Sequence, residues 1–308
     1  MKIAVIGPGG IGCLFSGLLA EAGHDVSLID RRPDRAALIS REGLIIESRG
    51  KLRIVPLGAY AFPADLEPVE LIILCVKAHE TAGTMPSVMA LSVPQTKVLS
   101  LQNGLGNMEA IKRVVADGNL FAGVTTHGAT VIGLNHVRHA GAGSTIIGPL
   151  NHNNEGAESL AKMFSKAGIE STAEKNTAGL LWSKLVINAA ICPVSALSGL
   201  ANGQIIENDK WRSLLCQAAE ESGKIAAAKG IKLSFADPVK AVLEVCEKTA
   251  ANISSMLQDI RRGRPTEIME INGAVLRTAA ETGLDAPTNT MLYQSVIDLE
   301  KRNEYKGR

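Results

Sequence analysis

Aromatic side chains, an excess of charge of one sign and long apolar runs are scarce or absent in this chain of 308 residues. Aromatic residues make up only 3%, so the core must be built mainly from Leu, Ile, Val and Ala. The 32 basic and 31 acidic residues leave a net charge of +1. This balance excludes the electrostatic attraction typical of proteins that bind nucleic acid or an anionic membrane.

Cysteine is also sparse, and its spacing excludes two kinds of site. The five cysteines are Cys13, Cys75, Cys192, Cys216 and Cys246. They are widely separated and form no Cys-x-x-Cys pair, which argues against a disulfide framework and against a zinc site. No metal is therefore expected. The opening MKIAVIG enters a strand without the pattern of a signal peptide, and no uninterrupted apolar run reaches about 18 residues. We therefore expect a cytoplasmic protein that is not bound to a membrane.

The first half of the chain alternates short β-branched runs with helical patterns. A helix is predicted at 11–22 and another at 157–167, followed by one short strand. Such β-α-β alternation predicts a parallel sheet covered by helices on both faces and finished by antiparallel hairpins. The other strands of this single sheet are predicted at 2–6, 26–29, 71–76, 98–101, 120–123, 130–132 and 144–148.

Strand signals vanish after Asn176, so the second half is predicted to be all-helical. The length of the chain agrees with two domains of about 150 residues each. We place them at 1–174, an α/β domain, and 175–308, a helical domain. The helices of the second domain are predicted at 177–191, 211–229, 238–260, 266–282 and 288–302.

A glycine pattern indicates what the first domain binds. IGPGGIG places Gly7, Gly9 and Gly12 as G-x-G-x-x-G after a strand and at the start of a helix. In this context Gly7 permits a tight turn, Gly9 lets a pyrophosphate approach the backbone, and Gly12 permits close packing of helix and strand. The motif therefore predicts a dinucleotide-binding Rossmann domain.

The residues after the second strand give conflicting signals for the cofactor. Asp30 lies near the position where an acid binds the ribose 2′-hydroxyl of NAD. Arg31 and Arg32 follow at once and suit the 2′-phosphate of NADP, unless they simply belong to a surface loop. These residues leave the choice between NADP(H) and NAD(H) open.

Two further strands end in polar residues at the edge where ligands collect in open α/β sheets. Lys77 ends ILCVKAHE, and Asn103 ends LSLQNGLGN. Asn103 with Gly104 is also favourable turn chemistry, so a structural role is an equal alternative there.

The second half carries a polar stripe on an apolar helix. In LLWSKLVINAAICP, Lys184, Asn188 and Cys192 are four residues apart and share one face, and Pro193 predicts a kink immediately after them. Lys184 either extends its amine to solvent or serves as a cationic donor to a carbonyl oxygen that receives hydride.

A second polar set lies further along the helical half. Asn252 and Ser255 are three residues apart on one predicted helix face. Glu267 is predicted in the first turn of a helix, where an acid is favourable for reasons of dipole and capping alone.

Taken together, these motifs resemble the ketopantoate reductase (2-dehydropantoate 2-reductase) family from end to end. The matching stretches are GPGGIG, VKAHE, QNGLGN, TTHGA, LWSKLVIN, LANGQ, NISSMLQDI, TEIMEING and APTNTMLY. The resemblance implies a Rossmann domain joined to a helical domain like the C-terminal domain of 6-phosphogluconate dehydrogenases, with the active site between them. It also implies hydride transfer from NADPH to 2-dehydropantoate, which gives (R)-pantoate for pantothenate and coenzyme A biosynthesis.

The same resemblance implies roles for individual residues. Lys184 would donate the proton, with Glu267 as its acidic partner near cofactor and substrate. The dinucleotide would be bound by Gly7, Pro8, Gly9, Gly10, Ile11, Gly12, Arg31, Lys77, Asn103, Ala129 and Glu267. The substrate would be bound by Asn103, Lys184, Asn188, Asn202, Asn252 and Ser255, together with Cys192 on the same stripe. Either Glu220 or Glu221 matches a further acidic position.

Two departures from the family pattern bear on function. Cys192 stands where a second asparagine is usual, and a thiol cannot reproduce the hydrogen bonds of an amide. Asp30 stands where an apolar residue is common in members that use NADPH, so NAD(H) stays an alternative. A reductase of another branched 2-keto acid and a non-catalytic dinucleotide-binding protein are the alternative functions. The helical half is compatible with a homodimer, whose interface the sequence does not identify.

Overall fold

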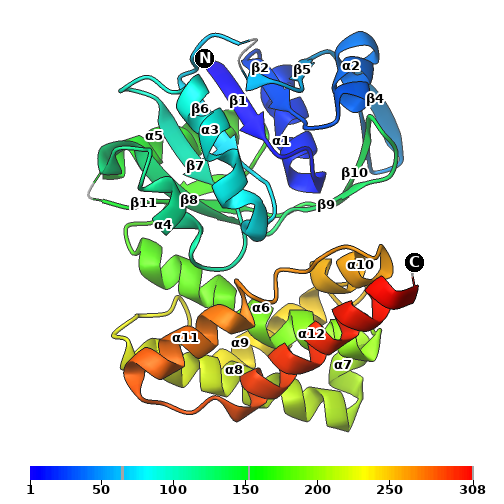
Figure 1. Ribbon diagram of the computed structural model, residues 1–308, viewed down its shortest axis with the longest axis vertical. Helices are drawn as coiled ribbons and strands as arrows, with labels where there is room; N and C mark the ends of the chain where they lie inside the picture. Colours follow the sequence, from blue (N-terminus) through cyan, green and yellow to red (C-terminus); the bar gives the residue numbers. More distant parts are fainter. Residues whose placement is uncertain (64–65, 152, 307–308) are drawn as a thin grey trace. The chain divides into compact units, whose positions relative to one another are not determined.

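The computed structural model describes residues 1–63, 66–151 and 153–306. The chain forms two compact units, which Figure 1 shows in sequence colours. The first unit holds Met1–Gln102 and Asn107–Thr177, and the second holds the chain from Ala178 onward together with Asn103–Gly106. A short segment from the middle of the first half therefore belongs to the second unit.

The first unit contains an eight-stranded sheet in the order β12-β11-β8-β7-β6-β1-β2-β5. The central strand β1 (Lys2–Ile6) is buried on both faces, as is usual in parallel sheets. The pairing of β8 with β11 is antiparallel, and all other pairs are parallel, as predicted. The other strands are β2 (Asp25–Ile29), β5 (Gly58–Tyr60), β6 (Leu71–Leu74), β7 (Lys97–Ser100), β8 (Leu120–Thr125), β11 (Thr145–Pro149) and β12 (Ser171–Ala173).

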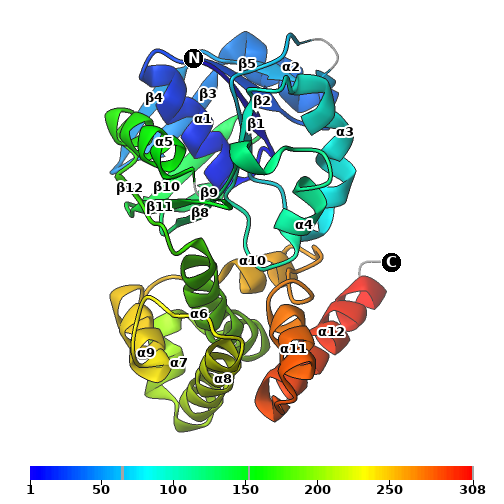
Figure 2. The same cartoon turned by 90° about the vertical axis from the view of Figure 1, so that its left-hand side faces the viewer.

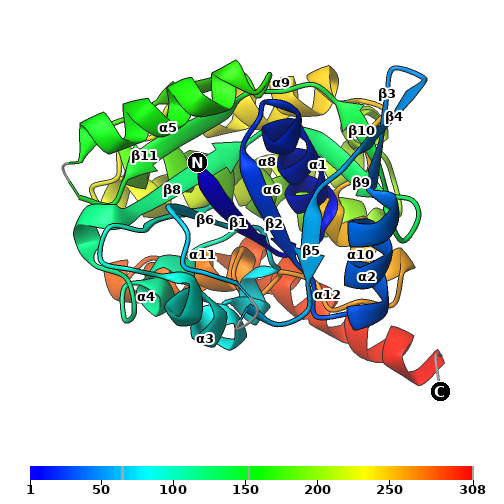
Figure 3. The ribbon, with the colours of Figure 1, turned by 90° about the horizontal axis from the view of Figure 1, so that it is seen from above.

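Helices cover both faces of this sheet, which confirms the predicted α/β architecture (Figure 3). Ile3 and Val5 of β1 point into one hydrophobic cluster with α1 (Gly10–Glu21), α2 (Pro33–Glu42) and α5 (Asn154–Lys166). Ala4 and Ile6 point into the opposite cluster with α3 (Thr81–Leu91) and α4 (Asn107–Ile111). The alternation of side chains along a strand thus assigns successive residues to different layers.

A second sheet of four strands was not predicted. It has the order β4-β3-β10-β9, formed by β3 (Leu44–Ser48), β4 (Lys51–Val55), β9 (Gly128–Val131) and β10 (His136–Gly141). The prediction that the strand at 130–132 belongs to the main sheet was wrong, because β9 forms a hairpin with β10, which in turn pairs with β3. Leu44, Ile46 and Val137 of this sheet share a core with α1, which therefore packs against both sheets.

The second unit contains helices joined by loops and no strand among its described residues, as predicted (Figure 2). The prediction of one helix at 238–260 was wrong, because Asp237 and Ser254 each cap a separate helix, α9 and α10. The helix predicted from residue 266 starts only at Asn272. The helices are α6 (Thr177–Ser198), α7 (Asn202–Glu207), α8 (Asp209–Ala228), α9 (Pro238–Lys248), α10 (Ser255–Arg261), α11 (Asn272–Thr282) and α12 (Pro287–Lys306).

Helix α6 continues through Pro193 to Ser198, so the predicted end at Ile191 was wrong. Proline has no N–H with which to bond the carbonyl of Ala189 one turn earlier. The fully buried Asn272 replaces that bond, because its Nδ2 donates to the Ala189 oxygen at 2.9 Å. Helix α6 is also the one helix among the described residues that is long and apolar enough to cross a membrane, but its burial inside the protein marks it as a core helix.

Candidate active site

The polar stripe of α6 is half-buried at its first two residues and buried at its third. Lys184 and Asn188 are half-buried, whereas Cys192 is buried in the hydrophobic core of the second unit. Burial lowers the pKa of Lys184 from its ordinary value, and the nearby Cys192 opposes part of this shift. A lysine with a lowered pKa gives up its proton more readily, which suits a general acid.

A chain of hydrogen bonds links three of the predicted site residues in the second unit. Asn188 Nδ2 donates to Asn103 Oδ1 at 3.4 Å, and Asn103 Nδ2 donates to Glu267 Oε2 at 3.1 Å. Asn103 and Glu267 are 164 positions apart in the sequence. The buried carboxylate therefore fixes the orientation of the Asn103 amide, which in turn faces the α6 stripe.

A tight turn holds Asn103 in this place. Gly104 has a φ of +77°, and a Cβ on it would lie 2.5 Å from the Glu270 oxygen, so the turn needs glycine there. The N–H of Leu105 donates to the same Glu270 oxygen at 3.0 Å. The predicted turn at Asn103 is therefore confirmed, and the same turn places its side chain in hydrogen bonds with Asn188 and Glu267.

Glu267 lies outside any helix, which corrects the prediction that it sits in a first helical turn. Helix α11 begins at Asn272, and residues 268–271 form a turn before it. The Glu267 carbonyl accepts the N–H of Ile271 at 2.9 Å. Capping of α11 therefore does not explain the acid, whose side chain reaches Asn103 instead.

Asn202, Asn252 and Ser255 lie where α7 and α10 begin. Asn202 donates its backbone N–H to the Asn252 oxygen at 3.0 Å and its amide to Thr249 Oγ1 at 2.8 Å. The prediction that Asn252 and Ser255 share a helix face was wrong, because Ser254 caps α10 and Asn252 lies in the irregular segment before that cap. Asn252 and Ser255 are both exposed.

Of the two candidate acids on α8, Glu221 has a structural role. Its carboxylate accepts the backbone N–H groups of Thr288 at 2.8 Å and Asn289 at 2.9 Å. These donors belong to the first turn of α12 and have no partner within the helix. Glu220 instead pairs with Lys224 on the surface.

The glycine loop of the first unit has the geometry that its motif predicts. Gly7 has a φ of +112°, and a Cβ on Gly12 would lie 1.9 Å from the Gly7 oxygen. Gly9 is exposed, and a Cβ on it would meet nothing nearer than 3.9 Å, so its backbone is open to a ligand. The N-terminus of α1 begins there, which provides N–H groups for an anion.

Gly10 has a contact that sequence reasoning missed. A Cβ on it would lie 2.2 Å from the Ala129 oxygen of β9. The second sheet therefore brings Ala129, a predicted cofactor residue, against the glycine loop. The pattern G-x-G-x-x-G leaves this position unspecified, so only the packing of β9 reveals the constraint.

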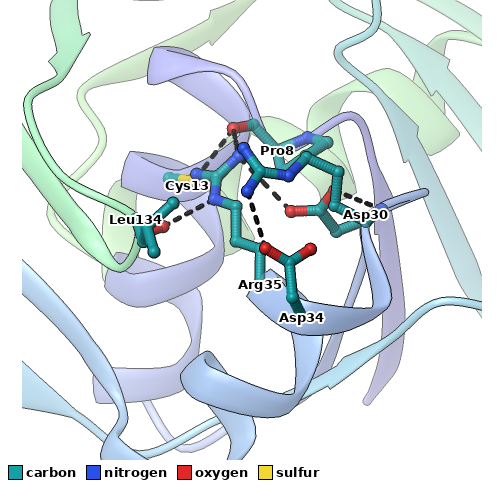
Figure 4. Close-up of polar contacts among 7 residues, drawn as sticks. Pro8, Cys13, Asp30, Asp34, Arg35 and Leu134 are labelled. Carbon is teal, nitrogen blue, oxygen red and sulfur yellow. Dashed lines mark hydrogen bonds and ion pairs between the residues drawn. The ribbon is translucent and has the colours of Figure 1, made fainter.

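The residues beyond β2 and β6 are arranged around two arginines. Arg31 is exposed and pairs with Glu80, which lies in the 3-10 turn Ala78–Glu80 that follows Lys77. Asp30 is buried and pairs with Arg35 of α2, a residue that sequence reasoning missed (Figure 4). In the part of the chain that the structure describes, no cluster of three or more His, Cys, Asp or Glu side chains is placed to hold a metal ion.

Two family models match this chain. The model described as Ketopantoate reductase PanE/ApbA matches residues 3–152. The model described as Ketopantoate reductase PanE/ApbA C terminal matches residues 176–300. The match therefore extends over both units.

Known proteins are similar over nearly their whole length. The 2-dehydropantoate 2-reductase of Pyrococcus horikoshii is 38% identical over 297 residues, which cover 96% of each chain. A PanE/ApbA family ketopantoate reductase from Ralstonia eutropha JMP134 has a TM-score of 0.90 at 31% identity, covering 99% of this chain and 100% of that chain. D-mandelate dehydrogenase in complex with NADH and anilino(oxo)acetate has a TM-score of 0.92 at 27% identity, with the same coverage.

Proposed function

Because this chain belongs to the ketopantoate reductase family, we propose that it uses NADPH as hydride donor and Lys184 as proton donor. The reaction is the reduction of 2-dehydropantoate to (R)-pantoate in pantothenate biosynthesis. The observation that carries the assignment of the site is the arrangement of Lys184 beside the hydrogen-bonded chain from Asn188 through Asn103 to Glu267.

Lys184 would act on the carbonyl oxygen of the keto acid. A bound dinucleotide would supply the hydride for the carbonyl carbon, and negative charge would then develop on the carbonyl oxygen. The Lys184 ammonium stabilises that charge and gives the oxygen a proton, for which its lowered pKa is favourable. Glu267 keeps the Asn103 amide in a fixed orientation, so that it can contact nicotinamide and substrate.

The remaining polar side chains of the second unit would bind and orient the substrate. Asn188 offers an amide that hydrogen-bonds both as donor and as acceptor, which suits a hydroxyl or a carboxylate. Asn202 has a buried Oδ1 with no hydrogen-bond partner among the described residues, which leaves an acceptor for a substrate hydroxyl. Asn252 and Ser255 are exposed donors close to the turn that contacts Asn202.

The first unit fits a dinucleotide. The open backbone of Gly9 and the N-terminus of α1 suit the pyrophosphate, with Gly7, Pro8, Gly10, Ile11 and Gly12 shaping the loop. Lys77 and Ala129 line the same region of the fold, beyond β6 and on β9. The exposed guanidinium of Arg31 supports NADPH, because it suits a 2′-phosphate.

Comparison of the two cofactors tests this assignment. With 2-dehydropantoate as substrate, kcat/KM is expected to be at least about tenfold higher for NADPH than for NADH, because only NADPH carries a 2′-phosphate that the exposed Arg31 guanidinium can bind in addition to Glu80. Steady-state oxidation of each cofactor, followed by absorbance, gives both values. A preference for NADH would contradict the choice of cofactor while leaving the reduction itself intact.

A second candidate function is the reduction of another branched 2-keto acid. Cys192 favours it, because a buried thiol stands where the family pattern has an amide. The similar fold of D-mandelate dehydrogenase points to the same class of 2-hydroxy and 2-keto acids.

We propose that the protein works in the cytoplasm, because the cysteines among the described residues are all free. We also propose that it assembles as a homodimer.

A further inference from the structure

An ion pair lies buried at the end of β2, next to the glycine loop (Figure 4). Arg35 Nη1 is 3.3 Å from Asp30 Oδ2, and the two side chains are only 10% and 4% exposed. Asp30 Oδ1 accepts the backbone N–H of Arg32 at 3.0 Å. Oδ1 is thus held by a backbone hydrogen bond, whereas Oδ2 has no hydrogen-bond partner among the described residues and is held by the ion pair with Arg35.

The guanidinium of Arg35 is fixed by three further contacts. Its Nη1 donates to the Pro8 oxygen in the glycine loop at 2.9 Å, and its Nε donates to the Leu134 oxygen between β9 and β10. Its Nη2 contacts Cys13 Sγ of α1 at 3.4 Å. Arg35 thus ties together α2, the glycine loop and the second sheet, and cannot turn away from Asp30 without breaking these bonds.

Asp30 is the group that balances the charge of Arg35. Burial raises the pKa of Cys13 to about 11, although Arg35 opposes the shift, so this thiol is neutral near pH 7. Arginine stays protonated in proteins. The buried group is therefore a neutral pair of one cation and one anion, and the carboxylate contributes no net charge to the surface above it.

Two exposed arginines lie at the same place, each paired with an acid. The side chains of Arg31 and Arg32 are 81% and 57% exposed, and their present partners are the surface acids Glu80 and Asp34. A free acid at the end of this strand binds a ribose diol and repels a 2′-phosphate. Here the acid is withdrawn and neutralised, while two arginines face solvent.

We infer that Arg35 determines the cofactor preference of this enzyme by holding Asp30 inside the protein and cancelling its charge. Arg35 is a positioning residue, because it acts on the dinucleotide through Asp30. The inference rests on the proposed binding of a dinucleotide at the glycine loop. It explains how a chain with an acid typical of NAD-binding proteins accepts a 2′-phosphate.

Dissociation constants for NADPH and NADH, measured by isothermal titration calorimetry, test the role of Arg35. In Arg35→Met the freed Asp30 carboxylate is expected to weaken the binding of NADPH more than the binding of NADH. The ratio of the two dissociation constants should therefore change by at least about tenfold. In Asp30→Asn/Arg35→Met the charge is gone, and the ratio should return to that of the unaltered protein. Arg41→Met removes an exposed arginine from the same helix and should leave the ratio unchanged.

The inference would be overturned if Arg35→Met bound NADPH and NADH more weakly by the same factor. It would also be overturned if the changed ratio of the dissociation constants persisted in Asp30→Asn/Arg35→Met. If Arg35→Met does not fold, Asp30→Asn alone decides: the NADH constant should change by less than about tenfold, and a larger loss would show that Asp30 contacts the ribose. The ratio of the NADPH and NADH dissociation constants in the unaltered protein tests the proposed cofactor. The change of that ratio between variants tests the role of Arg35, so the two proposals can fail separately.

Discussion

Lys184→Ala is expected to lower kcat for the reduction of 2-dehydropantoate by about 10²- to 10⁴-fold, the usual contribution of a general acid. The dissociation constant for NADPH should stay nearly unchanged, because the glycine loop and Arg31 belong to the first unit. Stopped-flow and steady-state kinetics give the first quantity, and fluorescence titration gives the second. Lys224→Ala, which removes an exposed lysine of α8, is the matched control and should keep full turnover.

The pH dependence of kcat/KM provides a second reading of the same residue. The ammonium form is the active one, so activity is lost as pH rises through the pKa of Lys184. Because burial lowers that pKa, the alkaline limb is expected below pH 10.5, the ordinary value for lysine. In Lys184→Arg the limb should vanish, since a guanidinium keeps its proton. Full turnover in Lys184→Ala, or an unchanged limb in Lys184→Arg, would show that another group donates the proton.

Gly10→Ala is expected to lower the free energy of unfolding by about 2–3 kcal/mol, an effect of overpacking. The added Cβ would lie 2.2 Å from the Ala129 backbone oxygen, which cannot move without shifting β9. Urea unfolding followed by circular dichroism measures the loss. The packing against β9 would be contradicted if Gly10→Ala were as stable as the unaltered protein.

Gly9→Ala is the matched variant one residue earlier. Its Cβ has no neighbour nearer than 3.9 Å, so the cost in stability should be about 1 kcal/mol or less. The new methyl group would nevertheless stand where the pyrophosphate approaches the backbone, and NADPH should bind at least about tenfold more weakly. The two glycines thus separate packing from ligand binding.

Local patterns in the sequence were sufficient for most strands of the main sheet, the glycine loop and the α6 stripe, but not for β3, β4, β5 and β10. Lys184 and Asn188 share a face because the spacing of an α-helix is fixed, and Gly7 and Gly12 follow from a turn between adjacent strand and helix. Helix ends were less predictable. Asn272 satisfies the carbonyl that Pro193 leaves open, and this bond, across 83 positions, lets α6 continue.

Contacts between distant segments could not be predicted. The bond from Asn103 to Glu267 depends on a turn that joins the second unit, and the placement of Ala129 against Gly10 depends on a second sheet. Asp30 and Arg35 are only five positions apart, but their pairing requires α2 to turn its Arg35 toward the core. An acid at position 30 can be read from the sequence, but only the fold determines whether its charge is exposed.

The most direct test of the central claim is the specificity of the purified enzyme for keto acids with NADPH. We expect kcat/KM for 2-dehydropantoate to exceed that for phenylglyoxylate, 2-ketoisovalerate and other 2-keto acids by at least about tenfold. A tenfold preference for another acid would contradict the assignment of substrate. Tight binding of NADPH without oxidation by any keto acid would contradict the assignment of a reductase altogether.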